Sequence, residues 1–79
     1  MTKFRIFFGC TPLGAARTSE MFNDKNVAKE HMHNEAKNTA QALGVDINSQ
    51  YFQLTDEDYK IATGNGCTYR GCLLPVAED

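Results

Sequence analysis

The sequence lacks most of the features that assign a chain to a specialised class of protein. Its 79 residues include no tryptophan, two prolines and no apolar run long enough to span a membrane, which needs about 18 residues. The amino terminus has no apolar stretch of the roughly 7–15 residues found in signal peptides. Its three cysteines form an odd, sparse set, whereas small secreted domains carry dense, even sets. We therefore expect a cytoplasmic protein in a reducing compartment.

The sequence also lacks a strong charge of either sign. Eight Lys and Arg residues face ten Asp and Glu residues, which gives a net charge of −2. Nucleic-acid-binding domains usually show a clustered basic surface. The near balance of charge in this sequence therefore leads us to expect no direct binding to nucleic acid and no membrane partner. Hydrophobic residues make up 42% of the chain, which is too many for a disordered protein. We expect residues 1–79 to form one globular domain.

An amphipathic helix is the clearest element in the sequence. Asn23, Asp24 or Asn26 can each cap its start, and Gly44 suits the left-handed position after its end. Small and apolar residues recur between these ends at steps of three or four, and they are Ala28, Met32, Ala36, Thr39 and Leu43. Polar residues form the opposite face, and they are Glu30, Asn34, Lys37 and Gln41. The pattern predicts a helix over about 24–43 whose narrow face packs across a sheet.

Alternating residues on both sides of this helix predict strands. The stretch "KFRIFF" at 3–8 is typical of a half-buried strand, and residues 9–19 are predicted to be a loop because they contain two glycines and Pro12. "SQYFQL", "YKIAT" and "CTYRGCLL" predict three further strands. Asn65-Gly66 indicates a type I′ hairpin turn between the last two. Pro75 indicates that the last strand ends there or lies at an edge.

One segment leaves two architectures open. Residues 55–63 begin with Thr55 and acidic residues and end before Gly64, a pattern that also describes a short helix. The order is therefore β-α-β-β-β, which we favour, or β-α-β-α-β. Either order is a small two-layer α+β domain, with one amphipathic helix packed across a mainly antiparallel sheet.

The stretch "CTPLGAARTS" at 10–19 resembles the motif of cysteine-dependent phosphatases and arsenate reductases. That motif, C-x5-R followed by Ser or Thr, resembles Cys10, Arg17 and Thr18 and implies a thiolate nucleophile in a ring of backbone N–H groups. Here six residues separate Cys10 from Arg17, and Pro12 removes one N–H from the ring. We expect Cys10 to be buried near the end of the first strand and Arg17 to lie solvated on a loop.

The spacing of histidine and cysteine in the sequence matches no common metal-binding motif. His31 and His33 lie two residues apart on the predicted helix, so they point in nearly opposite directions and cannot hold one ion. Cys67 and Cys72 are separated by four residues, which is wider than the usual cysteine pair of a structural zinc site. We expect no metal site, no cofactor and no catalytic residue.

The carboxyl-terminal half holds the residues best suited to contact a partner. "TDEDY" is the densest cluster of charge, and tyrosine and arginine are enriched in protein interfaces. The predicted binding residues are Tyr51, Asp56, Glu57, Asp58, Tyr59, Tyr69 and Arg70. We expect them to cover a basic, nucleic-acid-binding surface on a protein target.

The expected function is that of a small non-catalytic protein that binds and inhibits a larger macromolecular target. Small acidic α+β proteins without motifs are common among phage products that disarm bacterial defences, so an anti-CRISPR-like inhibitor in the cytoplasm of a bacterial host is the leading hypothesis. The alternatives are a degenerate Cys-Arg phosphatase or arsenate reductase and a small-ligand, for example nucleotide, binding protein. Both a monomer and a homodimer fit the sequence.

Overall fold

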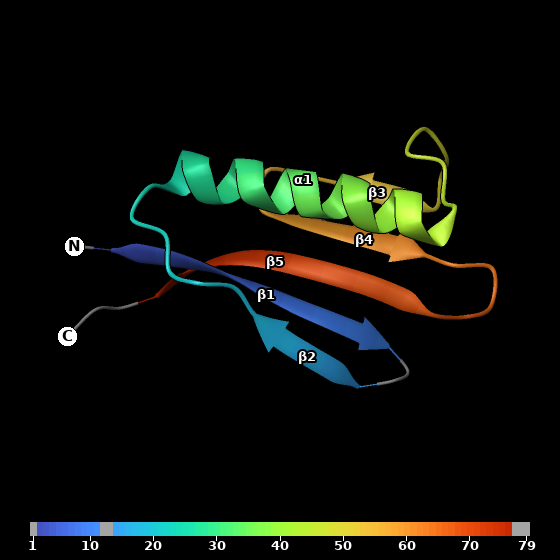
Figure 1. Cartoon of the computed structure of the whole chain (residues 1–79), viewed down its shortest axis with the longest axis horizontal. Helices are drawn as coiled ribbons and strands as arrows, with labels where there is room; N and C mark the ends of the chain where they lie inside the picture. Colours follow the sequence, from blue (N-terminus) through green and yellow to red (C-terminus); the bar gives the residue numbers. More distant parts are fainter. Residues whose placement is uncertain (1, 12–13, 77–79) are drawn as a thin grey trace.

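A computed structural model describes residues 2–11 and 14–76, which contain five strands and one helix. In chain order they are β1 (Lys3–Thr11), β2 (Ala15–Thr18), α1 (Lys25–Leu43), β3 (Phe52–Leu54), β4 (Asp58–Ala62) and β5 (Thr68–Val76). The strands form one antiparallel sheet in the order β2-β1-β5-β4-β3, with α1 along one face (Figure 1). The predicted fold class, a two-layer α+β domain with one helix across an antiparallel sheet, is confirmed.

Helix α1 has the ends that the sequence predicts. The Asp24 carboxylate accepts a hydrogen bond from the Asn26 N–H at 2.8 Å, and Gly44 follows the helix with a left-handed φ of 73°. Ala28, Met32 and Ala36 are fully buried as predicted, and Ala40 joins them. Within the described residues, no helix combines the length and apolar character needed to cross a membrane.

The core lies between α1 and the face of the sheet that the helix covers. Ile6, Met32 and Ile61 are its largest fully buried side chains, and burying each contributes about 1.5–3 kcal/mol to the free energy of unfolding. The Tyr59 ring lies directly over Gly71, where an added Cβ would be 2.0 Å from Tyr59 Cε2. Gly71 therefore leaves the space that a large ring needs beneath a closely packed helix.

The prediction of a loop over residues 9–19 is wrong for most of that segment. Strand β1 continues to Thr11, and β2 pairs with it from Phe7↔Thr18 to Cys10↔Ala15. The residues of β2 show no apolar alternation because β2 is a short edge strand, formed by pairing with β1 rather than by burial of its own side chains. Gly14 takes a positive φ of 70°, and Pro12 lies outside the described residues.

For residues 55–63 the favoured order, β-α-β-β-β, is correct, because this segment contains β4 and no helix. The predicted type I′ turn is wrong, since Asn65 keeps a negative φ and only Gly66 takes a positive one, 88°. The Gly66 N–H bonds to Thr63 O at 3.3 Å, so a turn followed by a left-handed glycine joins β4 to β5.

Pro75 lies within β5 where one side of the strand has no neighbour. Phe4 and Phe22 exchange both backbone hydrogen bonds at 2.8 Å, so Phe4 directs no hydrogen bond toward its β5 partner, Pro75. On the other side of β5, β4 reaches only as far as the Asp58↔Cys72 pair. The prediction that the last strand ends at Pro75 or lies at an edge is wrong, because β5 is the central strand and continues to Val76. The missing N–H of Pro75 breaks no ladder bond because β4 does not extend this far along β5.

Candidate functional site

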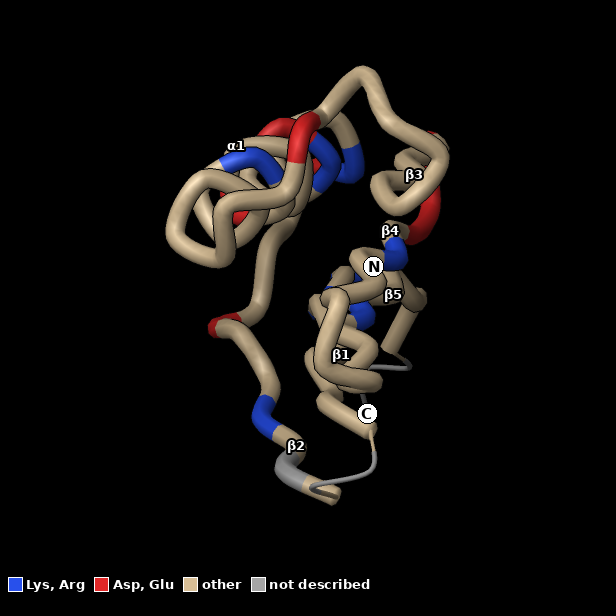
Figure 2. The backbone as a smooth tube through the Cα atoms, turned by 90° about the vertical axis from the view of Figure 1, so that its right-hand side faces the viewer, with Lys and Arg blue, Asp and Glu red and all other residues tan. Residues whose placement is uncertain are grey.

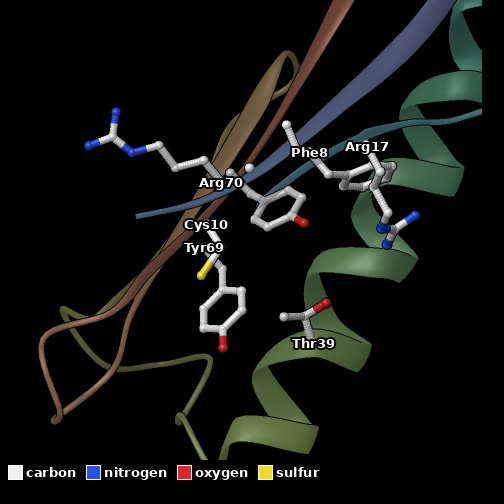
Figure 3. A pocket seen from close by; sticks show the side chains of 9 residues that line it. Phe8, Cys10, Arg17, Thr39, Tyr69 and Arg70 are labelled. Atoms are coloured by element: carbon white, nitrogen blue, oxygen red, sulfur yellow. The ribbon is translucent and has the colours of Figure 1, made fainter. Parts of the chain in front are cut away.

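A cleft of about 310 Å³ lies between α1 and the end of the sheet formed by β1 and β2 (Figure 3). Helix α1 packs over β1, β3, β4 and β5, whereas β2 extends beyond it. The cleft is lined by Phe8, Gly9, Cys10, Ala16, Arg17, Thr39, Tyr59, Tyr69 and Arg70. Its volume is at the lower end of the range for small-molecule sites, about 300–1,000 Å³.

Arg17 bridges the mouth of this cleft from β2 to α1. Its guanidinium lies 4.0 Å from the centre of the Phe8 ring, and one nitrogen lies 2.7 Å from Glu35 Oε1. The Arg17 side chain remains 63% exposed, so the ion pair contributes little to stability. It neutralises the guanidinium and leaves a cleft with an aromatic wall and little net charge.

Hydroxyl and thiol groups supply the polar chemistry of the cleft. Burial raises the pKa of Tyr59, with Glu35 adding to the effect and a hydrogen bond with Thr39 opposing it. The neighbouring Cys10 raises the pKa of Tyr69, through the charge of its ionised form and through a hydrogen bond. Both phenols are therefore neutral donors near pH 7, and they suit a ligand that accepts hydrogen bonds.

The geometry of Cys10 and Arg17 differs from that of a phosphatase loop. Cys10 is half-buried and pairs with Ala15 across a hairpin, while the Gly14 N–H is bonded to Cys10 O at 2.8 Å. Arg17 is in strand β2 and not on a solvated loop, and the helix that should follow it starts only at Lys25. In the described part of this segment, backbone groups take part in strand pairing and in the Gly14–Cys10 hydrogen bond, and they do not form a ring around a phosphate site.

The three predicted acidic residues lie together where β3 turns into β4: Asp56 and Glu57 are on the turn, and Asp58 is the first residue of β4. The Thr55 hydroxyl accepts the N–H groups of Glu57 and Asp58 at 3.2 and 3.0 Å and donates to Asp58 Oδ1 at 2.7 Å. His33 Nε2 lies 2.9 Å from Thr55 O, which ties the turn to α1. The turn is therefore exposed but fixed, and Asp56 and Glu57 project from it.

The other predicted binding residues lie apart from this turn, and three of the four line the cleft. Tyr51 is 55% exposed on the loop before β3, and Tyr59 is only 5% exposed in the core. Tyr59 and Tyr69 both line the cleft, whereas the Arg70 side chain points the opposite way from that of Tyr69, its neighbour in β5 (Figure 3). The seven residues consequently do not form one patch: the acidic residues gather at one turn, and Tyr59 and Tyr69 meet at the cleft.

Sequence reasoning missed the cleft because its wall depends on tertiary packing. Helical periodicity places Thr39 on the apolar face of the helix, and nothing in the alternation of Phe8 and Cys10 distinguishes a cleft from a core. Across residues 2–11 and 14–76, no three His, Cys, Asp or Glu side chains are grouped so as to hold a metal ion. His31 instead packs its ring 5.2 Å from that of Phe22.

Comparison with known proteins finds no relative. No family model, no curated protein and no solved structure matches the chain. Its function must therefore be inferred from its own residues and their geometry.

Proposed function

We propose that this chain is a non-catalytic protein that binds and inhibits a larger macromolecular target in the bacterial cytoplasm. The observation that carries the proposal is the acidic turn, defined as Thr55–Asp58, which presents carboxylates on a fixed, exposed backbone. Because the turn is already ordered, it loses little conformational entropy on binding, and little of the binding free energy from its charges is spent on ordering it. The partner that fits is a protein with a basic, nucleic-acid-binding surface.

Two contacts define which carboxylates are available to that partner. Glu57 Oε1 lies 3.7 Å from Lys25 Nζ, and Asp58 accepts the Thr55 hydroxyl. Asp56 has neither contact and is exposed. We therefore expect Asp56 to contribute most to binding and Glu57 to contribute less. The inhibitory role itself is supported by analogy with small phage proteins of this architecture that disarm bacterial defences.

The test is affinity capture from a host lysate with the wild-type chain and the double variant Asp56→Asn/Glu57→Gln. We expect the wild type to retain a subunit of a nucleoprotein effector complex and the variant to lose at least about 90% of it. Glu20→Gln/Glu30→Gln is the matched control, because it removes the same charge from exposed positions elsewhere. Equal retention by the turn variant, or no reproducible partner, would contradict the proposal.

The cleft supports a second candidate function, the binding of a small ligand such as a nucleotide. A thermal-shift screen of nucleotides and cyclic nucleotides tests it, because a specific ligand raises the melting temperature. Thr39→Val removes a hydroxyl from the cleft wall and should reduce the shift. The candidate fails if no compound raises the melting temperature, or if wild type and variant respond equally.

A further inference from the structure

The face of the sheet opposite α1 is covered by no helix or strand in the described part of the chain. The pairing register, together with the alternation of side chains along each strand, brings residues of β1, β5 and β4 together on this uncovered face. The set comprises Lys3, Arg5, Phe7, Gly9 and Thr11 of β1, Asp58, Lys60 and Ala62 of β4, and Thr68, Arg70, Cys72, Leu74 and Val76 of β5. Phe7 is 39% and Leu74 is 44% exposed, which is unusual for large apolar residues at the centre of a sheet.

Cations separated in the sequence meet on this uncovered face. Arg70 is paired across the ladder with Lys60 on one side and with Gly9 on the other, and Arg5 lies two positions beyond Phe7 on β1. Figure 2 shows Lys and Arg segments on these strands and also on β2 and α1, while acidic segments lie on α1, on the loop before it and near β3. A chain with a net charge of −2 thus presents a basic face.

These charges are not neutralised internally. Among the described residues, Arg5, Lys60 and Arg70 form no salt bridge. Asp58 is the one carboxylate in the set above, and it accepts a hydrogen bond from Thr55. The face therefore holds an excess of unpaired positive charge around an apolar centre, an arrangement that attracts polyanions.

The uncovered face also carries a depression of about 370 Å³. Its lining comprises Gln53, Thr55, Asp58, Tyr59, Lys60, Arg70, Gly71 and Cys72. Gly9 lies next to Arg70 without a side chain, so the Phe7 ring is not crowded from that direction. Arg5 and Arg70 are about 14 Å apart along the strands, with Phe7 midway, at about 3.4 Å per residue.

A second copy of this chain is a poor occupant of the uncovered face. Packing two such faces together would bring the three free cations of one protomer against those of the other, and like charges across an interface cost several kcal/mol. A single-stranded nucleic acid fits better, because phosphates meet the cations while a base stacks on an exposed aromatic ring.

We propose that the uncovered face binds single-stranded nucleic acid, with Arg5, Lys60 and Arg70 on phosphates and Phe7 stacking on a base. This proposal departs from the expectation of no direct nucleic-acid binding, and it uses none of the carboxylates of the acidic turn, although Asp58 belongs to both surfaces. Three phosphate contacts give a slope of about −2 for the logarithm of affinity against that of salt concentration, at about 0.7 per contact. A fourfold rise in salt should then weaken binding about 18-fold.

The experiment is fluorescence anisotropy of labelled 12-nucleotide dT and rU strands, with the full chain at 50 and 200 mM NaCl. We expect micromolar affinity at the lower salt, on the order of non-specific binding. Lys60→Gln/Arg70→Gln should cut the salt effect to about threefold, since one contact remains. Lys29→Gln/Lys37→Gln is the matched control, because it removes equal charge from α1 and should leave the salt slope unchanged.

Phe7→Leu tests the stacking step separately. It keeps an apolar side chain at a partly exposed position, so the fold should persist, and we expect about tenfold weaker binding from the lost stacking. Circular dichroism confirms that each variant is folded. The proposal is overturned if neither strand binds at 50 mM NaCl, if the α1 control weakens binding as much as the face variant, or if poly-glutamate binds through these residues while both strands do not. No protein target is needed, so its failure and that of the proposed inhibitor are separate results.

Discussion

Replacing Gly71 by alanine should strongly destabilise the protein. The new Cβ would lie 2.0, 2.6 and 2.8 Å from three carbons of the Tyr59 ring, far inside van der Waals contact. The ring is 5% exposed beneath α1, so it has no free space into which to turn. Overpacking a core costs about 1–3 kcal/mol, and a clash with a buried ring belongs at the upper end of that range.

The expected loss is about 3 kcal/mol, a large part of the roughly 5–15 kcal/mol that stabilises a domain. For a chain of this size it corresponds to a fall of about 12–24 °C in melting temperature, at about 4–8 °C per kcal/mol. Circular dichroism melts and urea titrations of the wild type and the variant measure it. With a urea slope near 1 kcal/mol/M, the midpoint should fall by about 3 M.

Gly64→Ala is the matched control for this experiment. No heavy atom lies within 4 Å of the position that a Cβ would take at Gly64, and the residue has no positive φ, so the same substitution should change the melting temperature little. Tyr59→Val supplies the second test, because removing the ring should abolish most of the cost of Gly71→Ala. If Gly71→Ala melts within about 2 °C of the wild type, the packing of Tyr59 on Gly71 is not as described.

Three further predictions concern the helix ends and alkaline pH. Asp24→Ala should lower the free energy of unfolding by about 1 kcal/mol through loss of the N-cap, measurable by urea titration. Gly44→Ala should cost about 1 kcal/mol in the same assay, because φ is 73° there and Ala is strained in that region. Burial, aided by Asp58, raises the pKa of Cys72 above 9.0, and burial raises the pKa of Tyr59 above 10.0. Above these ordinary values the folded state holds more protons than the unfolded state, so stability is full below about pH 9 and falls as the pH rises through the folded pKa values. Melting temperatures from pH 7 to 11 test this, and Cys72→Ala should remove the earlier part of the fall.

Local patterns in the chain were enough to predict the helix, four of the five strands in the described residues and the class of the fold. Asp24 and Gly44 act through local hydrogen bonds and backbone angles, so their roles can be predicted without knowledge of distant residues. Period-two alternation likewise identified β1 and β5, because side-chain direction in a strand follows from chain geometry alone. The acidic turn was also predictable, since its members are adjacent in the chain.

Strand β2, the cleft and the basic face depend instead on long-range packing. The edge strand β2 forms by pairing with β1. The cleft exists because α1 packs over the other strands and does not extend over β2. Lys60 and Arg70 lie ten positions apart, and Arg5 lies at the other end of the chain, yet the register of β1, β5 and β4 places all three on one surface. Charge clustering in space depends on strand register, which is set by long-range pairing and burial, so a nearly balanced composition concealed it.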